Sequence, residues 1–249
     1  MPLVEDLEKR GAWLFRWRSF LPLVIVPFAL AVAYFDDNLP EFTDVKWIAI
    51  CASISLFGQI IRALTIGYVP KGTSGRNTSE GQVAITLNTK GMYSLVRHPL
   101  YLGNYFMWLG IMLYSGSYEF AVIITVAFWI YYTLIAMTEE RYLIGQFKDE
   151  YFSWAEGVPA FVPKKLKWTH PGVFFSMKNV IKREYNGVFA VFVSFAVLDL
   201  AHNYREQHIL DMSDHMQFAL TISSVCFLVL RTIKKRTKWL DVAGREYVK

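Results

Sequence analysis

The stretch Thr89–Gly103, with the sequence TKGMYSLVRHPLYLG, lies at the beginning of an apolar segment and contains an arginine, a histidine, a proline and two tyrosines. A second polar stretch, Thr138–Arg141 (TEER), follows the next apolar segment along the chain. If these two apolar segments pair as antiparallel helices, the two polar stretches meet at one end of the pair. The fold and the function both depend on that meeting.

The two apolar segments are predicted to form a tight helical hairpin. The first runs over about residues 99–115, and Pro99 suits the first turn of a helix because the N–H that proline lacks has no helical partner there. The second runs over about residues 118–137, and its helical pattern continues through the twin glutamates to Phe147. Only Gly116-Ser117 separate them, and so short a connection makes neighbouring helices antiparallel.

The composition is typical of a membrane protein. Apolar residues make up 54% of the 249 positions and charged residues only 19%, and the apolar residues occur in long runs. The net charge of +5 does not predict a nucleic-acid partner, because the basic residues fall in alternate loops between the apolar runs. Cys51 and Cys226 lie inside apolar runs without ligand-like neighbours, so neither a disulfide framework nor a metal site is predicted.

Six apolar stretches predict an all-α, polytopic integral membrane protein with about six transmembrane helices. At roughly 1.5 Å per residue the last two reach only about 22–24 Å, which is short of a ~30 Å hydrocarbon core. These two either span the membrane or form a pair of interfacial or partly buried helices. The six stretches are approximately residues 19–35, 45–67, 99–115, 118–137, 185–200 and 216–230.

The loop charges predict the orientation. Lysine and arginine are concentrated at the N-terminus, in the loops 68–98 and 141–184, and in the tail from Arg231 onward. The connectors between them contain none, apart from Arg205. The positive-inside rule therefore places both termini and both polar stretches on the cytoplasmic side of the membrane.

The first polar stretch has two interpretations. Arg97 can extend to lipid phosphates while His98 is merely an interfacial polar residue. Against this reading, Gly91, Tyr93, Tyr101, Gly103 and Asn104 lie in the same stretch or directly after it. Glycines allow a ligand close to the backbone, and tyrosines supply a flat face and a hydroxyl, so this combination favours a ligand site.

The second polar stretch places two carboxylates next to each other. Glu139 and Glu140 lie about 100° apart on a helix, so we expect them to point in different directions. Acidic residues are unfavourable near a helix C-terminus, so a capping role is not predicted. Either the pair is a solvated helix end, or each carboxylate has a positive partner, for which Arg97 and a cationic ligand are the candidates.

The pattern Leu87–Tyr93 (LNTKGMY) followed by Arg97–Gly103 (RHPLYLG) resembles the cofactor motif of the isoprenylcysteine carboxyl methyltransferases and phospholipid methyltransferases. Met92 stands where many relatives have proline. The similarity covers about residues 87–163 and continues through Glu139-Glu140, Phe147, Tyr151, Trp154, Pro159 and Pro163.

The resemblance implies S-adenosylmethionine bound at the cytoplasmic membrane face and a lipid or lipid-anchored acceptor that arrives from the bilayer. It implies that Glu139 is a partner for the amine or ribose of the cofactor. We expect the chain to divide into an N-terminal two-span region with a cytoplasmic loop (1–86), a cofactor-binding hairpin module (87–165) and a C-terminal helical pair with a basic tail (166–249). The implied cofactor-binding residues are Gly91, Tyr93, His98, Pro99, Tyr101 and Glu139.

The chemistry of methyl transfer fits these residue types. A sulfonium carries an already activated methyl group, so the site must supply alignment and exclude water. An anionic oxygen acceptor needs no base, and Arg97 or Arg62 could orient it. An amine acceptor must lose a proton, for which Glu140 is the nearest candidate. Arg62 is otherwise a residue that extends toward the membrane surface, and Arg76 lies in a loop that is either a lid over the lipid headgroup or a plain connector.

We therefore expect a membrane methyltransferase that prefers O-methylation of a carboxylate or phosphate, with N-methylation of a phospholipid amine as the other reaction. Two alternatives stay open. Some membrane sterol reductases share a similar cofactor module and use NADPH, and a non-catalytic membrane scaffold would keep only the fold.

Overall fold

The protein is represented by a computed structural model that describes residues 11, 13–17, 21–35, 45–70, 77–78, 81–82 and 84–242. The fold is helical, apart from two paired strands of two residues each. In chain order the elements are η1 (Leu21–Val24), α2 (Ile25–Phe35), α3 (Val45–Tyr68), β1 (Asn77–Thr78), β2 (Gly81–Gln82), η2 (Met92–Ser94), α4 (Pro99–Tyr114), α5 (Tyr118–Phe147), α6 (Asp149–Ala155), α7 (Met177–Gln207) and α8 (Asp214–Arg236).

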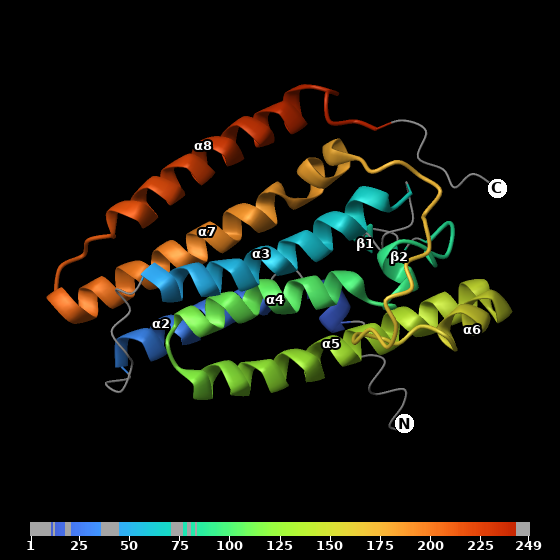
Figure 1. The fold of residues 1–249 in the computed structure, drawn as a ribbon, viewed down its shortest axis with the longest axis horizontal. Coiled ribbons are helices and arrows are strands. Elements are labelled where there is room, and N and C mark those ends of the chain that lie inside the picture. Colours follow the sequence, from blue (N-terminus) through green and yellow to red (C-terminus); the bar gives the residue numbers. More distant parts are fainter. Residues whose placement is uncertain are drawn as a thin grey trace.

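The predicted hairpin is present as α4 and α5. Gly116 turns the chain with a φ of 96°, a left-handed conformation that glycine adopts without strain. Ser117 then caps α5, because its side-chain oxygen accepts a hydrogen bond from the backbone N–H of Phe120 at 3.3 Å. The start of α4 and the end of α5 consequently lie at the same end of the bundle, together with α6 (Figure 1).

Helices α3 and α4 pack closely because both carry glycines at their contact. A Cβ on Gly58 would lie 2.4 Å from the carbonyl oxygen of Gly103, and a Cβ on Gly110 would lie 2.2 Å from Oγ of Ser55. Only glycine fits at such distances, which is the packing that small residues allow between membrane helices. Gly103 therefore serves helix packing, whereas its sequence context suggested ligand approach.

Four helices in the described part of the chain are long and apolar enough to cross a membrane, namely α3, α5, α7 and α8. The α7 and α8 helices, with 31 and 23 residues, extend well beyond the apolar stretches seen in the sequence, because polar residues continue each helix at both ends. Their length removes the shortfall expected for these two stretches. Helices α2 and α4 have only 11 and 16 residues, so a total of six spans stays a prediction.

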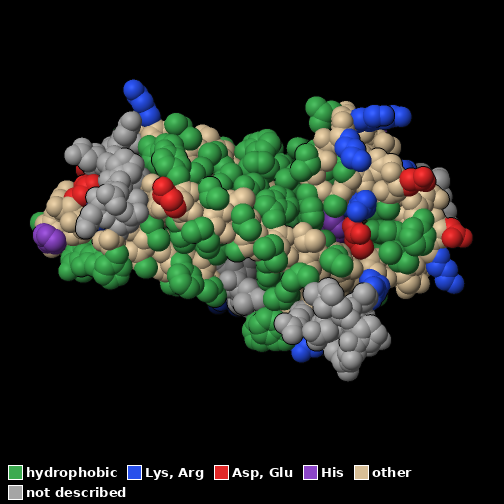
Figure 2. All heavy atoms as spheres, turned by 90° about the horizontal axis from the view of Figure 1, so that it is seen from below, with side chains coloured by type: hydrophobic (Ala, Val, Ile, Leu, Met, Phe, Trp, Pro, Cys, Tyr) green, Lys and Arg blue, Asp and Glu red, His purple; other side chains and the backbone are tan. Residues whose placement is uncertain are grey.

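The surface agrees with an integral membrane protein. Hydrophobic side chains cover the middle of the face shown in Figure 2, and charged side chains lie mostly toward the two ends. Many large apolar side chains on the candidate spans are exposed, including Leu56 on α3, Val122 on α5 and Leu228 on α8. Such side chains suit a lipid solvent better than water.

Candidate active site

The backbone of the first polar stretch is held by the segment that follows α6. The backbone N–H groups of Arg97 and His98 donate to the carbonyl oxygens of Pro159 and Ala160, at 2.8 and 3.0 Å. Pro99 then begins α4 at a position where no N–H is needed. These contacts fix the direction in which the Arg97 and His98 side chains leave the chain.

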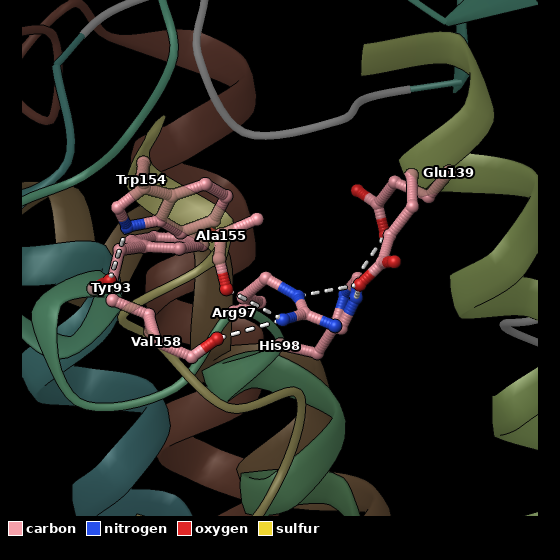
Figure 3. A network of polar contacts seen from close by, with 8 residues as sticks. Tyr93, Arg97, His98, Glu139, Trp154, Ala155 and Val158 are labelled. Carbon is pink, nitrogen blue, oxygen red and sulfur yellow. Dashed lines mark hydrogen bonds and ion pairs between the residues drawn. The ribbon is translucent and has the colours of Figure 1, made fainter. Parts of the chain in front are cut away.

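The imidazole of His98 joins the two polar stretches. Its Nε2 lies 2.8 Å from Oε1 of Glu140, and its Nδ1 lies 3.6 Å from Oε2 of Glu139 (Figure 3). Burial by itself lowers the pKa of His98, but hydrogen bonds and charge from the two glutamates outweigh burial, so that the pKa lies above its ordinary value. The two carboxylates were expected to point in different directions, yet their side chains are long enough to reach opposite nitrogens of one ring.

Arg97 links the second polar stretch to the end of α6 and to the loop after it. Its Nε donates to Oε1 of Glu140 at 2.8 Å, and its Nη1 donates to the carbonyl oxygens of Ala155 and Val158 at 3.2 and 2.7 Å (Figure 3). Glu140 therefore accepts from Arg97 and lies within hydrogen-bond distance of His98. Such donors stabilise a charged carboxylate, which makes Glu140 a poor proton acceptor.

Aromatic rings form one wall of the site. The Tyr101 hydroxyl donates to Oε2 of Glu139 at 2.8 Å, and the Tyr101 ring stacks on His98 with centroids 5.5 Å apart and planes 14° apart. Tyr132 from α5 lies 4.8 Å from Tyr101 between centroids, and its hydroxyl accepts a 3.0 Å hydrogen bond from Asn104. Tyr132 was not identified from the sequence, since it lies in an uninterrupted apolar and aromatic run.

A cavity of about 690 Å³ adjoins these residues. This volume is within the range of small-molecule sites. Eight of the residues predicted from the sequence line the cavity, and they come from α3, α4, α5 and the segment that precedes α4. They are Arg62, Tyr93, Arg97, His98, Pro99, Tyr101, Glu139 and Glu140.

Two predicted site residues are not in this lining. Gly91 has a φ of 63° and donates its backbone N–H to the carbonyl oxygen of Thr169 at 2.8 Å, so its described role is to turn and anchor the chain. Arg76 lies outside the residues that the structure describes.

Glu184 is the main cavity residue that the sequence reasoning missed. It was assigned to a basic loop over residues 141–184, but the end of α5, α6 and the start of α7 occupy much of that segment. Its buried carboxylate accepts from Arg62 through Nε at 2.6 Å and Nη2 at 2.8 Å, while Nη1 of Arg62 donates to Asn104 at 2.5 Å. Ser176, whose side chain caps α7 through the N–H of Asn179, was the available signal that a helix begins before Glu184.

Tyr151 carries an unsatisfied polar atom at the cavity. Its side chain is buried, and its hydroxyl makes no hydrogen bond of good geometry with any residue in the described part of the chain. Burial and the neighbouring Glu140 carboxylate raise the pKa of Tyr151. A buried hydroxyl without a partner is costly, so a polar ligand in the cavity would supply the missing contact.

Comparison with known proteins finds relatives by sequence. Residues 48–150 match the phospholipid methyltransferase family. The protein-S-isoprenylcysteine O-methyltransferase of Schizosaccharomyces pombe is 30% identical over 107 residues, which cover 43% of this chain and 45% of that protein. The corresponding Xenopus laevis protein is 26% identical over 125 residues, covering 50% and 43%. The cobalt-zinc-cadmium resistance protein CzcN of Cupriavidus metallidurans is 32% identical over 146 residues, covering 57% and 61%.

The chain is therefore similar over residues 48–150 to the phospholipid methyltransferases, and over about half of its length to protein-S-isoprenylcysteine O-methyltransferases. The chain spans between about two fifths and two thirds of the length of the curated relatives it matches. No solved structure matches the chain. Residues 177–236, which form α7 and α8, lie beyond the matched family region.

Proposed function

We propose that this protein transfers a methyl group from S-adenosylmethionine to a lipid or lipid-anchored acceptor at the cytoplasmic membrane face. One observation carries the proposal: His98 contacts both Glu139 and Glu140 at the wall of a cavity, within a region that matches a methyltransferase family. The cytoplasmic orientation rests on the distribution of lysine and arginine among the loops.

The residues at the polar end of the cavity fit a cationic cofactor. The cluster holds two carboxylates and one permanently charged arginine, Arg97, which pairs with Glu140, so the cluster has a net negative charge whenever His98 is neutral. The rings of Tyr101 and Tyr132 offer faces that attract a cation, and the Tyr151 hydroxyl needs a polar partner. S-adenosylmethionine would supply an activated methyl group on its sulfonium.

The other residues of the site position the charged groups and shield them from water. Arg97 fixes Glu140, and Glu140 with Glu139 fixes His98, so the carboxylates are already arranged before a ligand arrives. The aromatic wall from α4 and α5 would help to exclude water from a bound cofactor. Because Glu140 is held by Arg97 and His98, Glu140 is a weak base toward an amine. The geometry therefore favours an acceptor oxygen that is already anionic, which makes Glu140 a positioning residue.

Transfer of a radiolabelled methyl group from S-adenosylmethionine into membranes that contain the protein tests the proposal. We expect label in the lipid fraction, and we expect mild base to release it as methanol, because a carboxyl ester hydrolyses and a methylated amine does not. Label that resists mild base would indicate that the methylated atom is a nitrogen or a phosphate oxygen. No label above membranes without the protein, with tight NADPH binding instead, would support a reductase and contradict the proposal.

A further inference from the structure

The segment between α6 and α7 exposes large apolar side chains. Residues 161–176, here called the crossing segment, run across the end of the bundle at which α4 begins, at a steep angle to the helices (Figure 1). The exposed fractions of Val162, Leu166 and Phe174 are 72%, 86% and 96%. Three such side chains on one short segment indicate a surface that is covered by something less polar than water.

Hydrogen bonds hold the backbone of the crossing segment in place. The carbonyl oxygen of Thr169 accepts from the N–H of Gly91 at 2.8 Å, and the N–H of Thr169 donates to Oγ of Ser94 at 3.0 Å. At the end of the segment, the N–H of Ser176 donates to the carbonyl oxygen of Gly67 in the last turn of α3, at 2.9 Å. The outward direction of the apolar side chains is therefore a feature of the fold.

Lysines accompany the apolar side chains. Lys164, Lys165 and Lys167 are exposed and flank Leu166, and the crossing segment contains no acidic residue. This combination suits the surface of a bilayer with anionic lipids. Apolar side chains enter the boundary between headgroups and acyl chains there, while ammonium groups stay at the level of the phosphates.

The place of the crossing segment in the fold matches the edge of a membrane. The segment is bonded to the last turn of α3 and ends where α7 begins at Met177, and both helices are candidate spans. Directly after it, Lys178 places its ammonium 5.3 Å from the ring centroid of Trp239, which is 57% exposed. Tryptophan and lysine side chains are typical anchors at the interface between hydrocarbon and water.

We propose that the crossing segment is an interfacial anchor whose partner is the headgroup layer of a bilayer that contains anionic lipids. Val162, Leu166 and Phe174 enter this layer, and the three lysines contact lipid phosphates. The anchor does not depend on methyl transfer. It also lies outside the region that matches the phospholipid methyltransferases, which is residues 48–150.

The anchor sets the depth of the candidate active site. Pro159 and Ala160 directly precede the crossing segment, and their carbonyl oxygens accept from the N–H groups of Arg97 and His98. The bond between Thr169 and the N–H of Gly91 adds a second connection. Lipid contact at the crossing segment therefore fixes the height of the charged cluster relative to the headgroups.

Fluorescence quenching at single cysteines tests the anchor. Leu166→Cys and Phe174→Cys are made in a Cys226→Ser background, because Cys226 is exposed and Cys51 is buried. Each variant is labelled with an NBD fluorophore, and the full chain is placed in lipid nanodiscs. Phospholipid with a spin label on its headgroup should quench both positions about twofold or more above NBD at Glu150→Cys, an exposed position of α6 that serves as the control.

The lipid composition tests the lysines. Quenching should be stronger in nanodiscs of phosphatidylcholine and phosphatidylglycerol than in phosphatidylcholine alone, and Lys164→Gln with Lys165→Gln and Lys167→Gln should remove the difference. Equal quenching in the two lipids with the lysines present would overturn their role. Quenching by iodide in water as strong as at the control position would overturn the anchor. Protection from both the lipid and the water quencher would show that protein covers the segment, which overturns it as well.

Discussion

Nε2 of His98 lies 2.8 Å from Oε1 of Glu140, although 42 positions of sequence and a complete helical hairpin separate the two residues. This contact joins the first polar stretch to the second. It also makes the charge of the cavity depend on one proton, because His98 is the member of the cluster with an ordinary pKa near neutrality.

The first prediction concerns stability and pH. The pKa of His98 in the folded protein lies above its ordinary value, which is about 6.5. A group with a raised pKa stabilises the fold fully below its unfolded pKa, and this contribution is lost as pH rises through the folded pKa. The thermal unfolding midpoint should therefore fall with pH from about 6.5 upward. His98→Gln, which cannot gain a proton, should flatten that part of the profile, and an unchanged slope would contradict the assignment.

The second prediction concerns cofactor binding and pH. Protonated His98 offsets one carboxylate, and a cationic ligand gains affinity when that proton is lost. The affinity for S-adenosylmethionine should rise as pH passes through the raised pKa of His98, and binding below it should release protons. Calorimetric titrations in two buffers of different ionisation enthalpy measure the release. His170→Ala, at an exposed histidine, is the control and should keep the pH dependence.

The third prediction concerns the contact between α3 and α4. A Cβ on Gly58 would lie 2.4 Å from a backbone oxygen that cannot move aside, so Gly58→Ala should destabilise the protein by about 1–3 kcal/mol. A Cβ on Gly145 of α5 would meet nothing within 4 Å. Gly145→Ala should therefore be neutral or stabilise by up to about 1 kcal/mol, since alanine favours a helix. Equal denaturation midpoints for the two variants would contradict the close packing of α3 on α4 at Gly58.

The fourth prediction separates the two roles of Arg62. Glu184→Leu leaves the partly buried guanidinium of Arg62 without its ion partner, which should cost about 1–3 kcal/mol of stability. Replacing both residues, as Arg62→Met with Glu184→Leu, should recover most of that stability. Methyl transfer should stay at least tenfold below the unmodified protein, because the double variant lacks the cavity-lining guanidinium that can orient an anionic acceptor. Recovery of both stability and transfer would show that Arg62 is only structural.

The sequence predicted the parts of the fold that local patterns determine. The apolar run at residues 45–67 agrees with α3, and Pro99 and Gly116-Ser117 marked where the hairpin begins and turns. The predicted helices were too short where polar residues continue a helix beyond its apolar run, as in α7 and α8. Hydropathy alone places the end of a helix at the first charges, although the backbone remains helical beyond them.

The candidate site was predicted in outline for the same reason. His98, Tyr101, Glu139 and Glu140 stood out because polar groups beside an apolar run need partners. The partner of Arg62 did not stand out in the sequence. Glu184 is 122 positions away from Arg62 and becomes its neighbour only through the packing of α3 on α7. The role of Gly103 could not be decided from the sequence either. Ligand approach and helix packing both favour a glycine, and only the opposing helix shows that Gly103 permits close packing.

The most direct test of the central claim is equilibrium binding of radiolabelled S-adenosylmethionine to the purified protein in detergent, with His98→Ala, Glu139→Gln and the exposed control Glu150→Gln in parallel. The account predicts saturable binding to one site, weakened at least tenfold in His98→Ala and Glu139→Gln and unchanged in Glu150→Gln and in excess NADPH. Absence of binding, displacement by NADPH, or equal affinity in all four proteins would contradict it.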